Sequence, residues 1–330
     1  MYIFWSDFIQ PILEELTKQE RQIIVEIGSS TGENTKNILK FCNHTKSFCH
    51  IIDPLDIGNY EEIKSLLEAN GKHHKTTSLE AIPSLIDGNV YLIDGDHNWY
   101  TVFHELDEIF RLHVQDKNPS SYPVLFFHDV EWPYARRDLY YQIDRIPPEF
   151  RQPSFLGGLI PGKSELSETE GINFGMNQAA LSGGAKNGVL TGIEDALIKY
   201  NGLNFYDFYI VPGNSGLGCL FPKLRYGQST AEFVKNRLTP LTHWKGYIHK
   251  FSDAYWNTEQ ARSLSDQKYD QLMEKYNELV AEYGVRMEKY NQLHGEARHA
   301  LATLEKFNKS GIFKGIMNLR RIFKRIGLMS

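Results

Sequence analysis

Short apolar runs alternate with amphipathic stretches over the first half of the chain. Each run has the length of a buried strand, and the stretches between runs carry apolar residues at helical spacing. An amphipathic helix opened by Ser6 precedes the first run, over residues 6–19. The predicted strands lie near residues 22–27, 48–53, 73–77, 90–94 and 123–128. Alternation of this kind predicts an α/β fold with a doubly wound, mostly parallel sheet.

The alternating pattern breaks in the middle of the chain. Residues 151–188 are rich in glycine and polar side chains, and a loop of that length inside a domain is typically a functional lid or disordered. We expect acceptor contacts from this lid insertion, namely Asn173, Asn177, Lys186 and Asn187. A helix from Leu190 to Tyr200 and a hairpin around Pro212–Asn214 follow, which places an antiparallel pair at the sheet edge.

The last third of the chain has a heptad pattern. After a helical connector over residues 229–265, apolar and aromatic residues recur at a and d spacing over residues 266–308, which predicts a coiled coil and a homo-oligomer of open strand number. Arg286 interrupts the pattern at one d position. The other a and d positions are Tyr269, Leu272, Tyr276, Leu279, Tyr283, Tyr290, Leu293, Ala297, Ala300, Leu304 and Phe307.

Residues 310–330 form a basic amphipathic helix. Lysines and arginines flank one apolar face, which consists of Ile312, Ile316, Leu319, Phe323 and Ile326. Such a helix either lies in the headgroup region of an anionic membrane or caps the coiled coil. The first alternative predicts peripheral contact with the inner face of a membrane.

Acidic residues and histidines directly follow several of the predicted strands. Asp53 follows the second strand, Asp94 and His97 follow the fourth, and His128–Asp129 end the fifth. The carboxyl ends of parallel strands face one ligand crevice, so these side chains should converge there. This arrangement is typical of an enzyme.

A glycine turn follows the first predicted strand and opens a helix. Its sequence, Gly28–Gly32, lacks the G-x-G-x-x-G spacing that suits a pyrophosphate. Asp53 stands about twenty residues further on, where an acid commonly holds ribose hydroxyls. The pattern favours a ligand with a ribose and a carboxylate but no pyrophosphate, such as S-adenosylmethionine.

These motifs together resemble the class I S-adenosylmethionine-dependent methyltransferases. Residues 20–225 are more narrowly similar to the metal-dependent O-methyltransferase branch, which includes macrolide-sugar O-methyltransferases and cephalosporin-hydroxylase-like proteins. The resemblance implies His97 as general base and a divalent metal bound by Asp94, His128 and Asp129. The residues that it implies at the cofactor are Glu26, Gly28, Ser30, Gly32, Asp53, Ser78 and Asp94.

One position departs from this family pattern. Relatives tend to carry Asp-Asn or Glu-Asp where this chain has His128–Asp129, and Mg²⁺ prefers oxygen ligands. Three alternatives follow: Asp129 binds the metal while His128 does other work, the site prefers Mn²⁺ or another borderline metal, or the metal is lost. A structural core histidine is the simplest alternative role for His128 alone.

The residue types also suit methyl transfer to a sugar hydroxyl. A cation bound by Asp94 and Asp129 would lower the pKa of that hydroxyl, and His97 could then take its proton. Aromatic and basic residues after the fifth strand would hold the acceptor, although an ordinary helix start is an equal alternative. They are Trp132, Tyr134, Arg136 and Arg137.

Composition narrows the class of protein. The chain has 330 residues and a net charge of −5, which does not suggest a nucleic-acid partner. Its three cysteines lack zinc-site spacing, and no secretory or membrane-spanning segment is apparent, so we expect a cytoplasmic protein. The C-terminal pattern favours a glycan or glycolipid acceptor. Alternatives are a soluble glycosylated natural product and a non-catalytic scaffold with a degenerate cofactor fold.

Overall fold

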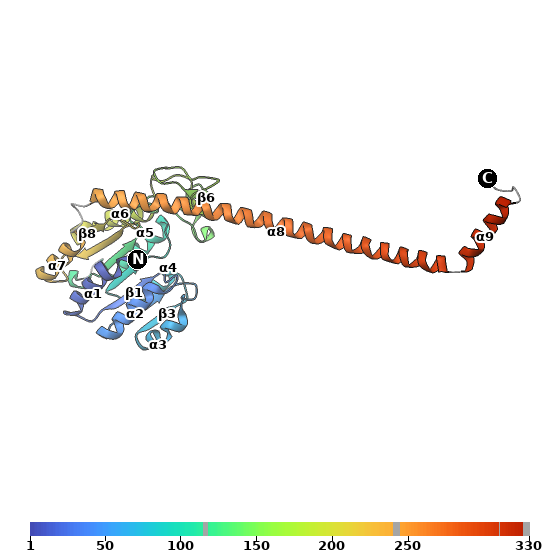
Figure 1. Ribbon diagram of the computed structural model, residues 1–330. Helices are drawn as coiled ribbons and strands as arrows, with labels where there is room; N and C mark the ends of the chain where they lie inside the picture. Colours follow the sequence, from blue (N-terminus) through green and yellow to red (C-terminus); the bar gives the residue numbers. More distant parts are fainter. Residues whose placement is uncertain (115–117, 240–244, 310, 326–330) are drawn as a thin grey trace. The chain divides into compact units, whose positions relative to one another are not determined.

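The computed structural model describes residues 1–114, 118–239, 245–309 and 311–325 (Figure 1). The chain forms two compact units, Met1–Leu264 and Ser265–Ser330. The first unit contains a sheet with helices on both faces, and the second is helical. This agrees with the predicted α/β fold followed by a helical C-terminal part.

The central sheet has seven strands in the order β3-β2-β1-β4-β5-β9-β8. The first five strands along the chain pair in parallel, and β9 pairs antiparallel with both β5 and β8. A mostly parallel sheet with an antiparallel pair at its edge is therefore confirmed. The strands are β1 (Ile23–Ile27), β2 (Phe48–Ile52), β3 (Gly71–His74), β4 (Val90–Ile93), β5 (Val124–His128), β8 (Tyr206–Val211) and β9 (Leu217–Pro222).

Helices cover both faces of this sheet, as a doubly wound fold requires (Figure 1). Residues of α1, α2, α3 and α7 form one buried cluster with Ile24, Leu92 and Phe126. Residues of α5 and α6 form the other with Val25 and Phe127, because successive strand side chains point to opposite faces. The helices are α1 (Gln10–Thr17), α2 (Glu33–Thr45), α3 (Tyr60–Asn70), α4 (Ser78–Ala81), α5 (Trp99–His113), α6 (Val189–Tyr200) and α7 (Gln228–Leu238).

Two boundaries differ from the sequence-based expectation. The third strand starts at Gly71 and ends at His74, because Gly71 pairs with Cys49 of β2. The first helical segment opens with a π-helical turn over Trp5–Ile9, and α1 follows at Gln10. Neither difference moves a strand end that carries a candidate site residue.

The glycine-rich insertion is an ordered hairpin rather than a structureless loop. It contains β6 (Ser154–Leu159) and β7 (Ile172–Ala179), which pair antiparallel with an irregularity between Gly157 and Leu159. A small apolar cluster, separate from the two main ones, supports it with Leu159, Leu166 and Ile172. Because this segment is rich in glycine and asparagine, it lacks the alternation of apolar and polar residues from which a strand is normally predicted.

One long helix contains most of the C-terminal part. This helix, α8 (Lys245–Lys309), combines the second half of the predicted connector with the whole heptad segment, and residues 240–244 lie outside the described part. It is followed by α9 (Gly311–Arg325); the predicted apolar position Ile326 lies beyond the described residues. Within the described helices, none has the length and apolar content needed to cross a bilayer.

Candidate active site

The glycine turn brings the ends of β1 and β4 into backbone contact. Gly28 has a φ of +87°, and a Cβ there would lie 2.2 Å from the Asp94 carbonyl oxygen. Its N–H donates to the Ile52 carbonyl. No other residue type fits this position, because a side chain would push the two strand ends apart. The turn therefore places Asp94 beside the start of the loop that leads into α2.

Asp53, which directly follows β2, holds the same turn through hydrogen bonds. Its Oδ2 accepts hydrogen bonds from the Ser29 N–H (2.8 Å) and the Ser29 hydroxyl (2.9 Å), and the Ser30 N–H lies at 3.4 Å. Its Oδ1 accepts from the Leu55 N–H at 2.9 Å. The carboxylate thus organises the loop in addition to lining the pocket, and Oδ1 retains a lone pair for a hydroxyl donor.

Glu26 and Gly32 do not line the pocket. Their contacts instead hold the glycine turn and the start of α2. Glu26 is 1% exposed and accepts hydrogen bonds from Asn34 Nδ2 and Thr35 Oγ1 of α2. Burial raises the pKa of Glu26 to about 7. Gly32 has a φ of +81°, and a Cβ there would meet the Gly58 carbonyl oxygen at 2.1 Å. Both residues hold the turn and helix in place.

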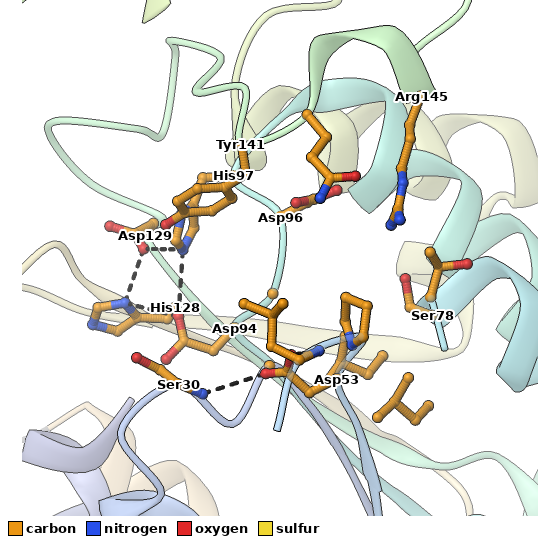
Figure 2. A pocket seen from close by; sticks show the side chains of 18 residues that line it. Ser30, Asp53, Ser78, Asp94, Asp96, His97, His128, Asp129, Tyr141 and Arg145 are labelled. Atoms are coloured by element: carbon orange, nitrogen blue, oxygen red, sulfur yellow. Dashed lines mark hydrogen bonds and ion pairs between the residues drawn. The ribbon is translucent and has the colours of Figure 1, made fainter. Parts of the chain in front are cut away.

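One cavity of about 530 Å³ joins the other residues predicted at the cofactor, at the metal and as general base (Figure 2). Ser78 and Arg145 lie on one side of it, and the histidines with Asp94 and Asp129 gather on the other. The volume suits a ligand of nucleoside size together with a second molecule. The predicted site residues that line it are Gly28, Ser30, Asp53, Ser78, Asp94, His97, His128 and Asp129.

Three further lining residues are not among the predicted site residues. Tyr141, Gln142 and Arg145 come from the irregular segment after β5, which has no motif. Tyr141 pairs its hydroxyl with His97 Nδ1 at 3.2 Å. Only the folded path of this segment over the strand ends brings the three side chains to the cavity.

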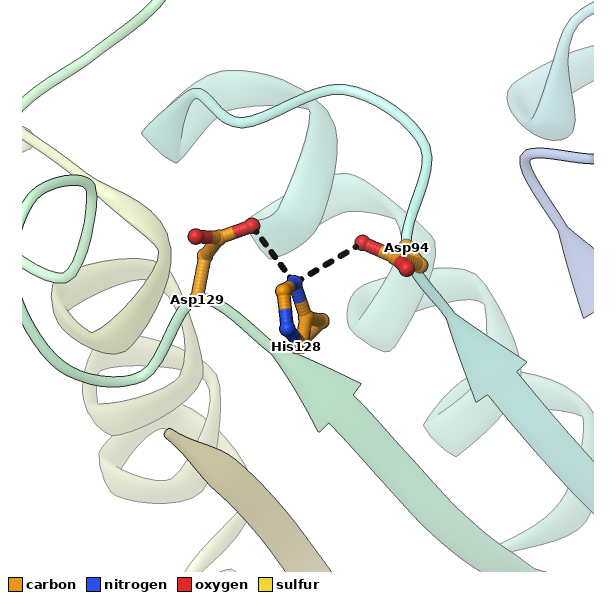
Figure 3. Close-up of side chains that lie close together, drawn as sticks. All are labelled: Asp94, His128 and Asp129. Atoms are coloured by element: carbon orange, nitrogen blue, oxygen red, sulfur yellow. Dashed lines mark hydrogen bonds and ion pairs between the residues drawn. The ribbon is translucent and has the colours of Figure 1, made fainter. Parts of the chain in front are cut away.

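Asp94, His128 and Asp129 form a tight charged cluster (Figure 3). His128 Nδ1 lies 2.9 Å from Asp129 Oδ2 and 3.3 Å from Asp94 Oδ1. Burial opposes the charge of His128, but the two carboxylates outweigh burial and raise the pKa of His128 to about 9. Burial also opposes ionisation of Asp94, yet His128 and the Met1 amine, 2.6 Å from Asp94 Oδ2, hold the Asp94 pKa well below its usual range.

His97 completes the cluster from the loop between β4 and α5. Its Nε2 lies 2.9 Å from Asp129 Oδ2 and 3.5 Å from Asp94 Oδ1, and its ring stacks on Tyr134 with a centroid distance of 5.6 Å. Burial lowers the pKa of His97, but the Asp129 and Asp94 carboxylates outweigh it and raise the pKa well above the usual value. The buried Asp129 carboxylate and the partly buried Asp94 carboxylate therefore require positive charge close by.

The donor set of this cluster fits a divalent cation. One oxygen of each carboxylate and His128 Nδ1 all lie within 4.8 Å of one another. Separations near 3 Å, such as the two to His128, match neighbouring ligands about 2.1 Å from a metal. A set of two oxygens and one imidazole nitrogen favours Mn²⁺ or a similar borderline metal over Mg²⁺.

Comparison with known proteins returns distant structural similarity only. No family model and no curated protein matches the chain. Among solved structures, the SAH-bound methyltransferase PaMTH1 of Podospora anserina is 12% identical, with a TM-score of 0.35, over 64% of this chain and 76% of that one. The 1,6-didemethyltoxoflavin-N1-methyltransferase of Burkholderia thailandensis is 9% identical, with a TM-score of 0.35, over 66% and 78%.

An O-methyltransferase family protein from the same Burkholderia species is 10% identical. It has a TM-score of 0.34 and is matched over 64% of this chain and 55% of that one. TM-scores near 0.35 do not by themselves identify a family. The functional assignment of this chain depends on the strand order and on the geometry of its own site.

The four predicted acceptor-binding residues lie outside the pocket lining. Trp132 packs edge-on against Trp256 of α8, and Tyr134 stacks on His97. Arg136 forms a bidentate ion pair with Glu194. Arg137 is 2% exposed and donates to the Ala179 and Ser164 carbonyls, so its guanidinium holds the hairpin instead of facing an acceptor.

The predicted contacts of the insertion are also engaged within the protein. Asn173 donates to the Tyr134 hydroxyl at 2.6 Å, and Lys186 Nζ lies 4.8 Å from the centroid of the Phe150 ring. Asn187 accepts from the Asp138 N–H at 2.7 Å. Asn177 accepts from the Tyr140 N–H through its backbone carbonyl, whereas its side-chain Oδ1 is buried with no hydrogen-bond partner among the described residues. The hairpin is thereby fastened to the segment that borders the pocket.

The buried carboxyl group of Glu105, in α5, leads to a prediction about stability that does not depend on catalysis. It is 1% exposed, and burial raises its pKa from 4.5 to about 8. The folded protein holds this proton more tightly than the unfolded chain, so stability falls as pH rises from 4.5 to 8. Relative to wild type, Glu105→Gln should gain on the order of 3 kcal/mol of unfolding free energy between pH 5 and pH 9.

Urea unfolding at the two pH values measures this gain. Glu149→Gln, at an exposed position, is the matched control and should follow the wild-type pH dependence. Equal pH dependence for Glu105→Gln and wild type would show that Glu105 is ionised in the folded protein.

Proposed function

We propose that this protein is a class I S-adenosylmethionine-dependent methyltransferase that transfers a methyl group to a hydroxyl. One observation carries the proposal: a single pocket joins the glycine turn and Asp53 to a cluster of two carboxylates and two imidazoles. The first part suits a ribose and a carboxylate ligand, and the second suits activation of an alcohol. Both parts of the pocket lie at the strand ends of a doubly wound sheet, which supports an enzymatic function.

The chain's own residues supply the binding groups for this cofactor. Gly28 and Ser30 line the pocket in the turn that leads into α2, and the free N–H groups at a helix N-terminus favour a carboxylate. Asp53 Oδ1 can accept from a ribose hydroxyl, and Ser78 lines the far side. The carboxylate of Asp94 favours a positively charged sulfonium in the same cavity.

Asp94, Asp129 and His128 Nδ1 would hold a divalent metal. When bound, this ion would orient an acceptor hydroxyl, lower its pKa and supply positive charge to the two carboxylates. His97 lines the same cavity. A metal bound to the two carboxylates would remove the cause of the raised His97 pKa, so that the neutral imidazole could take the hydroxyl proton. Alignment of donor and acceptor within the pocket would supply the remaining acceleration.

The acceptor that we propose is a sugar hydroxyl of a surface glycan or glycolipid. The support is the C-terminal part, because a coiled coil and a basic helix suit a cytoplasmic enzyme held at the inner face of a membrane where lipid-linked glycans are assembled. A soluble glycosylated natural product would not require this part. With a net charge of −5, a nucleic acid is not among the partners that we propose.

Methyl transfer from labelled S-adenosylmethionine to a panel of glycan acceptors tests the proposal. Linkage analysis of the product identifies the methylated hydroxyl. Labelled product from a glycan supports the proposal in full, whereas product from a free glycosylated small molecule alone would support the second acceptor class. A non-catalytic scaffold would give no labelled product with any acceptor.

Helix α9 gives the membrane proposal a separate test. It carries Lys314, Arg320 and Arg321 beside exposed apolar side chains such as Ile316 and Leu319, which are 49% and 52% exposed. Deleting residues 311–330 should lower binding to vesicles with anionic lipid at least tenfold, since each basic residue contributes about 1 kcal/mol near such a surface. Co-sedimentation with anionic and neutral vesicles measures this, and unchanged binding would argue against the anchor.

A further inference from the structure

The second unit exposes an apolar stripe along α8 that no other described residue of this unit covers. The Tyr and Leu side chains at its a and d positions between residues 269 and 293 are 56–65% exposed, and those at the neighbouring e positions Met273, Val280 and Met287 are 38–50% exposed. We infer that two copies of the protein pair antiparallel along this stripe, centred between Gly284 and Val285. The Tyr and Leu positions are Tyr269, Leu272, Tyr276, Leu279, Tyr283, Tyr290 and Leu293.

The stripe is large enough to hold two chains together. From typical side-chain areas, its residues expose roughly 1,000 Å² per copy. A stable interface of standard size buries about 800 Å² per partner. The heptad repeat also makes the stripe complementary to a second helix of the same sequence, because a and d side chains pack into matching holes.

A parallel, in-register pair places like groups opposite each other. Tyrosine would face tyrosine at the a layers of residues 269, 276, 283 and 290. Arg286, whose side chain is 76% exposed in the single chain, would face a second Arg286 inside the core. The charged g residues, such as Lys275 and Glu282, would face the apolar e residues Val280 and Met287 of the partner and find no opposite charge.

The antiparallel register removes each of these conflicts. In such a pair, a residues pack against d residues of the other copy, so Tyr276 meets Leu293 and Tyr290 meets Leu279. Arg286 meets Tyr283 of the second copy, where a guanidinium on an aromatic ring is favourable. Arg286 also keeps its ion pair with Glu282 of its own helix, at 2.7 Å.

The same register aligns opposite charges along one flank. Position g of one helix faces position g of the other in an antiparallel pair, which brings Glu282 opposite Lys289 and Lys275 opposite Glu296. Two-fold symmetry repeats each contact, so four intermolecular ion pairs form. On the other flank the e residues Val280 and Met287 meet each other. Apolar, cationic and ionic contacts all favour this one arrangement.

Spin-label distances on the full-length protein distinguish the two orientations. Asp270→Cys and Glu288→Cys place labels on exposed positions at different distances from the centre, and the native Cys42, Cys49 and Cys219 are fully buried. The antiparallel pair predicts roughly 45 Å between the labels at 270 and ~25 Å between those at 288, from the helical rise. Two similar short distances, or a protein that stays monomeric, would overturn the inference.

A charge exchange supplies a second, independent readout. Glu282→Lys and Lys289→Glu should each weaken dimerisation about tenfold, because each breaks two intermolecular pairs. The double variant should restore it, since the exchanged charges face each other only in the antiparallel register. Glu278→Lys, at an exposed position away from the stripe, is the control and should leave the dissociation constant unchanged in sedimentation experiments. Failure of the double variant to recover would contradict the proposed register.

Discussion

Asp129→Asn is expected to lower kcat at least about 10³-fold while the fold is retained. Asp129 is 5% exposed and faces both His97 and His128, at 2.9 Å each. Asparagine has the same shape and tolerates the φ of +60° at this position, but it lacks the charge that balances the two imidazoles and a metal. The loss of one anionic ligand should also weaken metal binding.

Initial rates at increasing Mn²⁺ and Mg²⁺ concentrations measure both effects. Removing metal from the wild-type protein with a chelator should reduce turnover to a comparable extent, and added metal should restore it. Asp144→Asn, whose carboxylate is 99% exposed, is the matched control and should behave as wild type. Full activity in Asp129→Asn, or in chelated wild-type protein, would contradict a metal-assisted mechanism.

His97→Gln is expected to reduce kcat by about 10²–10⁴, the usual contribution of a general base. The glutamine amide can still reach Asp129, which lies 2.9 Å from His97 Nε2, but it cannot accept a proton. Because His97 does not belong to the glycine turn, the affinity for S-adenosylhomocysteine should change less than about threefold.

Steady-state rates and calorimetric titration of S-adenosylhomocysteine separate these two quantities. His44→Gln, on the exposed side of α2, controls for the loss of an imidazole elsewhere. A His97→Gln protein that loses cofactor affinity but keeps its kcat would assign His97 to binding and not to proton transfer.

The parallel sheet was predictable because its strands are buried on both faces. Such strands appear in the sequence as continuous apolar runs, and β1, β4 and β5 end within a residue or two of their predicted ends. The ends of these runs carry Asp94, His128 and the glycine turn, so strand order alone predicts their convergence. The structure brings them into one cavity.

Other parts of the site depend on tertiary packing that no local pattern encodes. Arg137 belongs to a basic aromatic segment, but burial against the hairpin commits its guanidinium to two backbone carbonyls. Arg145 and Tyr141 reach the cavity only through the folded path of an irregular segment. The position of Asp53 after its strand predicts a contact with a ribose, but its hydrogen bonds to Ser29 and Leu55 follow only from the geometry of the loop.

We expect the cavity at the ends of β1, β2 and β4 to bind S-adenosylmethionine. Calorimetric titration of this cofactor into the full-length protein measures that binding. One site per chain should appear, with a dissociation constant of about 1–100 μM that is weakened more than about tenfold in Asp53→Ala. Absence of binding to the folded wild-type protein would rule out a methyltransferase site in this cavity.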